Sequence, residues 1–296
     1  MIAKPDRVTR RRQSAWSIAI YEGDSPLSLV PAPGIRNPVL TDEDVTDVPA
    51  DFVADPFMIR ERDQWWMFCE VFSGASARGE IGLATSKDGY AWRYEGIVLA
   101  EPVHLSYPYV FRAGDEYYMI PETYGFGGVD LYRAAQFPRG WRRAARLLQG
   151  TFADTSIFYR DERWWMFSCT NPAAHDTLRL YHSRHLMGPW EEHPRSPIVT
   201  GDRTRARPGG RVTEWNGSVL RFAQDCKPTY GTRVRAFQID ELTPAAYREH
   251  EVAQSPILNP GETWNRTGMH HVDPHLLPGG RWLACVDGYY MREPEA

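Results

Sequence analysis

Apolar residues occur along this chain in short runs that come in pairs. Residues 54–59 form one apolar run, a charged turn follows, and residues 65–70 form a second run. Two such runs, rich in aromatic and branched side chains and joined by a polar turn, predict a β-hairpin. The hairpin begins near one acid, Asp55, and ends at another, Glu70, 15 residues later.

The same hairpin recurs along the chain. Residues 107–122 and 154–169 keep the interval of 15, residues 273–287 form a slightly shorter copy, and residues 207–225 form a degenerate one. The first four copies are each followed by a third strand that leads to a turn containing Gly or Pro. Units of about four strands at a spacing of about 50 residues predict the blades of a β-propeller.

The last hairpin lacks a third strand because the chain ends soon after Asp287. Residues 17–21, followed by a turn at 23–26, match the missing strand, and pairing the two ends of the chain would remove an open sheet edge. We therefore predict an all-β fold, a single five-bladed β-propeller over residues 16–296, with its last blade closed by the N-terminal strands. Residues 1–15 are expected to form a flexible N-terminal segment. A two-sheet β-sandwich is the alternative.

Acidic residues begin or end several of these hairpins. In a propeller the first strand of each blade lines the axis and the second returns to the same end, so these acids should converge on one axial pocket. The expected group comprises Asp55, Glu70, Glu122, Asp154, Asp225, Asp273 and Asp287. Paired carboxylates in a partly dry site suit glycosidic-bond chemistry, in which one acid protonates the leaving oxygen and the other acts as base or nucleophile. Alternatively, several acids cap strand starts or bond aromatic side chains of the next blade.

The net charge and the cysteine content indicate which binding partners and which cell compartment to expect. The net charge is 34 − 38 = −4, and no run of one sign is longer than residues 10–12, so neither a nucleic-acid nor a membrane partner is expected. The chain has no apolar segment typical of a secretory signal or a membrane span, which predicts a cytoplasmic protein. The four cysteines are far apart in the sequence and are expected to be reduced thiols in the core.

The starts of the first and third repeats, residues 54–56 and 154–158, resemble those of the five-bladed propeller glycoside hydrolases of families 43, 32 and 68. Residues 104–110, 206–208 and 268–273, together with Gln224-Asp225, are similar to the N-terminal domain of glucosamine inositolphosphorylceramide transferase and its free-standing bacterial relatives. This resemblance implies the same propeller over essentially the whole chain.

The family-43 resemblance implies that Asp55 is the general base and that Asp154 tunes and orients the acid. Family 43 takes its acid, a Glu, from the start of the fourth blade, where this chain has Arg207. Glu122 is our candidate for the acid because it ends a second strand next to Tyr107. If no acid replaces the missing Glu, Arg207 would instead indicate an anionic ligand, such as a carboxylate or phosphate sugar.

Histidines supply the candidate metal ligands. Side chains alternate along a strand, so His271, Asp273 and His275 should share a face that could hold Zn²⁺. The family-43 resemblance suggests instead a water-mediated Ca²⁺ near His271. A histidine that only forms hydrogen bonds in the pocket is the third interpretation, and no metal ligand is assigned.

We therefore expect a glycoside hydrolase-like enzyme acting on a glycan or other small glycoside, with Asp55, Glu122 and Asp154 as its catalytic residues. The residues expected to contact substrate are Glu70, His104, Tyr107, Arg207, Asp225, Tyr230, His271 and Asp273. The alternatives are a non-hydrolytic sugar-binding module, a sugar-transfer or other tailoring enzyme that reuses the pocket, or a protein-interaction platform. The sequence does not specify the oligomeric state.

Overall fold

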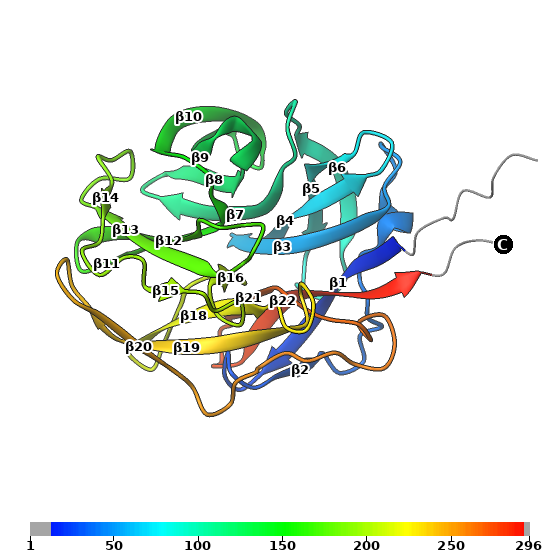
Figure 1. Ribbon diagram of the computed structural model, residues 1–296. Coiled ribbons are helices and arrows are strands. Elements are labelled where there is room, and N and C mark those ends of the chain that lie inside the picture. The colour runs from blue at the N-terminus through cyan, green and yellow to red at the C-terminus, as the bar shows by residue number, and fades with distance from the viewer. Residues whose placement is uncertain (1–12, 293–296) are drawn as a thin grey trace, which may run out of the picture.

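Five small antiparallel sheets surround a central axis in the computed structural model, which describes residues 13–292 (Figure 1). The described chain is otherwise irregular, apart from two three-residue 3-10 helices, η1 (Asp42–Asp44) and η2 (Tyr124–Phe126). Neither helix is long or apolar enough to cross a membrane. The predicted all-β five-bladed propeller is confirmed.

The first three blades follow one another along the chain. Blade I consists of β3 (Phe52–Glu61), β4 (Gln64–Ser73), β5 (Arg78–Ser86) and β6 (Arg93–Leu99). Blade II consists of β7 (Ser106–Ala113), β8 (Glu116–Glu122), β9 (Gly128–Gln136) and β10 (Arg139–Gln149). Blade III consists of β11 (Ala153–Arg160), β12 (Arg163–Cys169), β13 (Thr177–Ser183), β14 (Glu191–Glu192) and β15 (Val199–Thr200).

Blade IV is the degenerate repeat, and its first strand is interrupted. It consists of β16 (Arg207–Pro208), β17 (Thr213–Trp215), β18 (Ser218–Asp225), β19 (Arg233–Leu242) and β20 (Tyr247–Glu251). Both β16 and β17 pair with β18, and Gly210 lies between them with a φ of 139°. A Cβ at Gly210 would lie 1.8 Å from the carbonyl oxygen of Val272, so only glycine allows the close approach of blade V here.

Blade V joins the two ends of the chain. It consists of β21 (Val272–Leu276), β22 (Trp282–Arg292), β1 (Gln13–Gly23) and β2 (Leu29–Pro31), and β1 pairs with β22 along its full length (Figure 1). The predicted closure is confirmed. The structure places the start of β1 at Gln13, and residues 1–12 lie outside the described part, so the flexible segment expected at residues 1–15 stays a prediction.

The hydrophobic core lies between neighbouring blades, because both faces of each sheet are covered. The repeated aromatic pairs supply much of it: Trp65 and Trp165 are buried, whereas their neighbours Trp66 and Trp164 are partly buried. All four cysteines are buried and free, as the sequence predicts. The blades are thus held by side-chain packing, and the ring depends on its closing strand.

Truncation of a buried side chain in β1 tests this closure. Ile20 is fully buried, so Ile20→Ala should lower the free energy of unfolding by about 2–4 kcal/mol in urea titrations. Val30→Ala, at an exposed position of β2 in the same blade, should change it by less than about 0.5 kcal/mol. Equal small losses in the two variants would show that β1 does not close the ring.

Candidate functional site

The first strands of blades I, II and III share a backbone irregularity at the same place in the repeat. Asp55, Tyr107 and Asp154 have φ values of 51°, 47° and 50°, and the register with the second strand shifts at each of them. Positive φ is uncommon for residues other than glycine and costs about 1–2 kcal/mol. Each of these bulges directs a backbone N–H at an acid of the preceding blade.

These N–H groups fix three of the carboxylates. The N–H of Asp55 donates to Asp287 Oδ2 over 2.9 Å, that of Tyr107 donates to Asp55 Oδ2 over 3.2 Å, and that of Asp154 donates to Glu122 Oε2 over 3.3 Å. The acids of blades V, I and II are therefore positioned by the backbone of the blade that follows. Buried carboxylates need such donors because water no longer solvates them.

Five of the seven expected acids converge. Each is less than 9% exposed, and their charges act on one another; they are Asp55, Glu70, Glu122, Asp154 and Asp287. Two cationic groups lie among them: Arg207 from β16 and, when protonated, His270, which precedes β21. The cluster thus holds more potential negative charge than its cations can neutralise.

Arg207 links the carboxylates of blades II and III. Its Nε lies 2.5 Å from Asp154 Oδ2, and its Nη2 lies 3.3 Å from Glu122 Oε2. The amide of Gln224 donates a further bond of 2.6 Å to Asp154 Oδ2.

Two rings also contact the guanidinium of Arg207. The ring of Tyr230 lies over the guanidinium at 5.1 Å, and His175 Nδ1 lies 3.0 Å from Arg207 Nη1. Arg207 and Tyr230, both expected at the site, are therefore adjacent there.

The pKa values of Glu122 and Asp154 move in opposite directions. Burial, reinforced by the charge of Asp154, raises the pKa of Glu122 to about 8. Burial also acts to raise the pKa of Asp154, but the charge and hydrogen bond of Arg207 outweigh it and lower that pKa below its ordinary value. At neutral pH one carboxyl of this adjacent pair is protonated and the other is ionised.

Asp55 lies beside a second pair, His270 and Asp287. Burial raises the pKa of Asp55 to about 7, and the charge of His270 only partly opposes this. His270 Nδ1 is 2.8 Å from Asp287 Oδ1, and although burial acts to lower the pKa of His270, Asp287 raises it. Glu70 Oε1 lies 3.6 Å from His104 Nε2. Burial, and then the charge of Asp55, raises the pKa of Glu70 well above its ordinary value.

One group of side chains could hold a cation. Donor atoms of Asp55, His270 and Asp287 all lie within 4.8 Å of one another. The neighbouring His271 is fully buried, and its Nδ1 lies 3.8 Å from Asp55 Oδ1. Among the described residues, neither ring nitrogen of His271 nor Asp55 Oδ1 has a hydrogen-bond partner. Mixed nitrogen and oxygen donors suit Zn²⁺ better than Ca²⁺, which prefers oxygen.

Two of the acids expected at the cluster, Asp225 and Asp273, occupy other positions. The carboxylate of Asp225 faces away from the axis and pairs with Arg235 at 2.8 Å. Asp273 lies deeper in the channel, where it accepts from the N–H of Met58 and pairs with Arg211 and His275. The predicted face of His271, Asp273 and His275 therefore does not form a single metal site.

Tyr107 lies next to the acid cluster and packs against neighbouring blades. Its ring is fully buried, and its hydroxyl lies 2.8 Å from Ser156 Oγ and 2.7 Å from the N–H of Gly210, which donates to it. The side chain thus joins blades II, III and IV, and its hydroxyl already has protein partners. These contacts give Tyr107 a role in the packing of the axis, and its expected contact with substrate stays a prediction.

Sequence reasoning missed His175, Gln224 and His270. Gln224 precedes Asp225 on β18, and a strand places neighbouring side chains on opposite faces, so its orientation toward Asp154 excludes Asp225 from the cluster. His270 precedes the expected His271 and carries the contact with Asp287. His175 comes from the loop between β12 and β13, where no repeat marks it.

Sequence comparison identifies a family. Residues 9–289 match the family model described as glucosamine inositolphosphorylceramide transferase 1, N-terminal. The chain is 36% identical over 298 residues to a protein of that name from Oryza sativa subsp. japonica, and the match covers 93% of this chain. It covers 40% of the rice protein, so this chain spans less than half of its relative's length.

Two solved structures share the fold at low identity. A β-1,2-mannobiose phosphorylase from Listeria innocua has a TM-score of 0.65 and 13% identity, with 90% of this chain and 96% of that chain covered. The catalytic domain of a GH62 α-L-arabinofuranosidase from Coprinopsis cinerea has a TM-score of 0.60 and 12% identity, with 92% and 96% covered. At this identity the likeness is one of fold.

The pH dependence of stability tests the protonation of Glu122. Because burial raises its pKa from 4.5 to about 8, the folded protein binds more protons than the unfolded chain between these values. Glu122 should therefore make stability fall as pH rises across this window, by up to about 1.4 kcal/mol per unit. Glu122→Gln should remove that part of the decline in urea titrations at several pH values. The exposed Glu262→Gln should leave the decline unchanged, and equal slopes in all three proteins would contradict the assignment.

Proposed function

The chain belongs to the family of the N-terminal domain of glucosamine inositolphosphorylceramide transferase 1, and we propose that it acts on a glycan or glycoside through its axial carboxylates, as a glycoside hydrolase does. The observation that carries this proposal is the pair of Glu122 and Asp154. One carboxyl is protonated and the other ionised, and both are buried beside Arg207. Two adjacent carboxyl groups with different protonation states supply a proton donor and an anion at the same pH.

Each residue would have a distinct task. Glu122, whose raised pKa keeps its proton near neutral pH, would protonate the leaving oxygen. Asp154, held ionised by Arg207, would orient Glu122 and stabilise positive charge that develops on the sugar. Asp55, on the neighbouring blade, would act as base or nucleophile. Tyr230 and His104, which are less buried than the acids, would contact the substrate.

The comparisons support a carbohydrate substrate. The rice relative is named glucosamine inositolphosphorylceramide transferase 1, and the two solved structures are named for a mannobiose phosphorylase and an arabinofuranosidase. Each of the three names includes a sugar, but the reactions that they name differ. The fold therefore supports the substrate class more strongly than the reaction type.

A sugar-binding or sugar-transfer role is the second candidate. One observation favours it: Arg207 stands where the family-43 acid would begin the fourth blade, and it contacts both Glu122 and Asp154. Its guanidinium competes with a substrate oxygen for these carboxylates and could also bind an anionic group of a sugar. In that role the acids would orient a ligand and would not cleave it.

Kinetics on a panel of aryl glycosides and oligosaccharides test the hydrolase. Glu122→Gln should lower kcat/KM by about 10²- to 10⁴-fold because the proton donor is lost. Wild-type activity should decline as the pH rises through about 8, where Glu122 loses its proton. The exposed Glu262→Gln should retain wild-type kinetics.

Other results would select the second candidate. Product formed only when a sugar acceptor is added would indicate transfer. No turnover on any substrate, with calorimetric sugar binding that survives Asp55→Asn, would indicate a binding module. Unchanged hydrolysis by Glu122→Gln would contradict the assigned acid.

A further inference from the structure

Two adjacent cavities at the junction of blades II and III form a groove whose charged lining is entirely positive. One, of about 430 Å³, is lined by Arg133, Ala135, Arg142, Arg143, Ala144 and Met187. The other, of about 560 Å³, has Arg112, Tyr118, Tyr159, Trp164, Arg184 and Met187 in its lining. Met187 forms a wall of both, and no acid of the described residues 13–292 lines either cavity. We refer to the two together as the basic groove.

The basic groove is separate from the axial acids. Tyr159 lies five residues beyond Asp154 on β11, which corresponds to roughly 17 Å along the strand. The strand starts at the acid cluster and runs toward the other end of the propeller. A ligand in the basic groove would therefore not touch the carboxylates of the candidate site.

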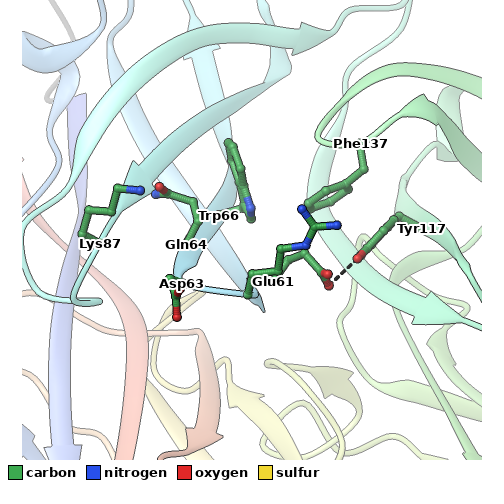
Figure 2. Close-up of a pocket in the computed structure, with 8 residues that line it drawn as sticks. Glu61, Asp63, Gln64, Trp66, Lys87, Tyr117 and Phe137 are labelled. Carbon is green, nitrogen blue, oxygen red and sulfur yellow. Dashed lines mark hydrogen bonds between the residues drawn. The ribbon is translucent and has the colours of Figure 1, made fainter.

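A repeat-equivalent cavity between blades I and II provides an internal comparison (Figure 2). Trp66 and Tyr117 occupy there the repeat positions that Tyr118 and Trp164 occupy in the basic groove. Its charged lining contains both signs, from Glu61, Arg62, Asp63 and Lys87, and the hydroxyl of Tyr117 donates to Glu61. The fold alone thus does not require an all-positive lining at this junction.

Acids compensate the arginines of the smaller cavity only in part. Arg133 and Arg142 are directly opposite each other on β9 and β10, a like-charge pairing that destabilises a sheet. Glu116 pairs with Arg133 at 3.4 Å, and Asp130, 3.7 Å from Arg143, is already bonded by Arg146. Within residues 13–292, Arg142 and Arg184 form no ion pair with an acid. An oxyanion between these strands would relieve the repulsion.

The larger cavity adds an apolar surface next to these charges. Tyr159 and Met187 are 54% and 48% exposed, among the most exposed large hydrophobic side chains of the described chain. The ring of Trp164 lies 5.1 Å from that of Tyr159, so two aromatic rings border the groove. Aromatic faces of this kind bind sugar rings and other apolar groups.

We propose that the basic groove binds a phosphate ester, with its phosphate between Arg133 and Arg142, which lie opposite each other on one face of the sheet, and its organic part on Tyr159 and Trp164. Guanidinium groups match the geometry of phosphate oxygens, and several of them together bind a doubly charged anion far better than one does. The phosphate could belong to a soluble metabolite or to a lipid headgroup. The chemistry at the arginines is the same for both.

Calorimetric titration with inorganic phosphate and with phenyl phosphate, at constant ionic strength, tests the site. Arg133→Gln/Arg142→Gln should weaken binding of both probes by about tenfold or more, as expected for the loss of charge-assisted hydrogen bonds. Arg93→Gln/Arg248→Gln removes the same charge from exposed positions on blades I and IV and should leave the affinity unchanged. Tyr159→Ala should weaken phenyl phosphate but not inorganic phosphate.

Vesicles distinguish the two sources of phosphate. Co-sedimentation with phosphatidylcholine vesicles containing phosphatidylglycerol, lost in Arg133→Gln/Arg142→Gln, would identify a lipid headgroup and correct the expectation of no membrane partner. Binding of the soluble probes without co-sedimentation would identify a soluble ester. Absence of phosphate binding, or equal binding by the groove and control variants with their folds verified by circular dichroism, would overturn the proposal. None of these outcomes depends on activity at the axial acids.

Discussion

The contact of Arg207 with Asp154 and Glu122 is the interaction on which the candidate site depends. Five carboxyl groups lie buried at one end of the axis, and in a low-dielectric environment their mutual repulsion would oppose folding. Arg207 stabilises the ionised form of Asp154, while Glu122 keeps its proton. Removing one partner of such a buried pair typically costs about 3–5 kcal/mol, because the other is left uncompensated. The ion pair that could limit access to the acids is therefore also the one that allows them to be buried together.

The repeated bulge explains how acids distant in sequence reach this position. A strand with regular pleating would keep the N–H groups of Asp55 and Asp154 in the ladder with their own second strands. The positive φ at these residues releases the N–H groups, which then donate to carboxylates of the preceding blades. The local backbone cost is offset by hydrogen bonds to buried anions, which are stronger than neutral ones. Blade packing and site geometry thus come from the same irregularity.

The fold was predictable from the sequence because a repeat of about 50 residues leaves few architectures, and the strand missing from the last unit matched residues 17–21. The convergence of Asp55, Glu122 and Asp154 followed from the same repeat. Side-chain direction was harder to predict: Gln224 and not Asp225 faces the axis, because blade IV is degenerate and gives no reference for its register. The prediction for Asp273 was wrong because this residue lies deeper in the channel than the cluster and pairs with Arg211. His175 lies on a loop outside the repeated hairpins, so no sequence pattern marked it as a site residue.

The protonation of Glu122 beside an ionised Asp154 is the central claim, and ¹³C NMR of the glutamate side-chain carboxyl groups measures it most directly. The signal of Glu122, assigned by its loss in Glu122→Gln, should titrate with a midpoint near 8, because burial and the neighbouring anion favour the neutral form. A midpoint near the ordinary value of 4.5 would show that Glu122 is ionised at neutral pH, and the division of the pair into acid and anion would be wrong.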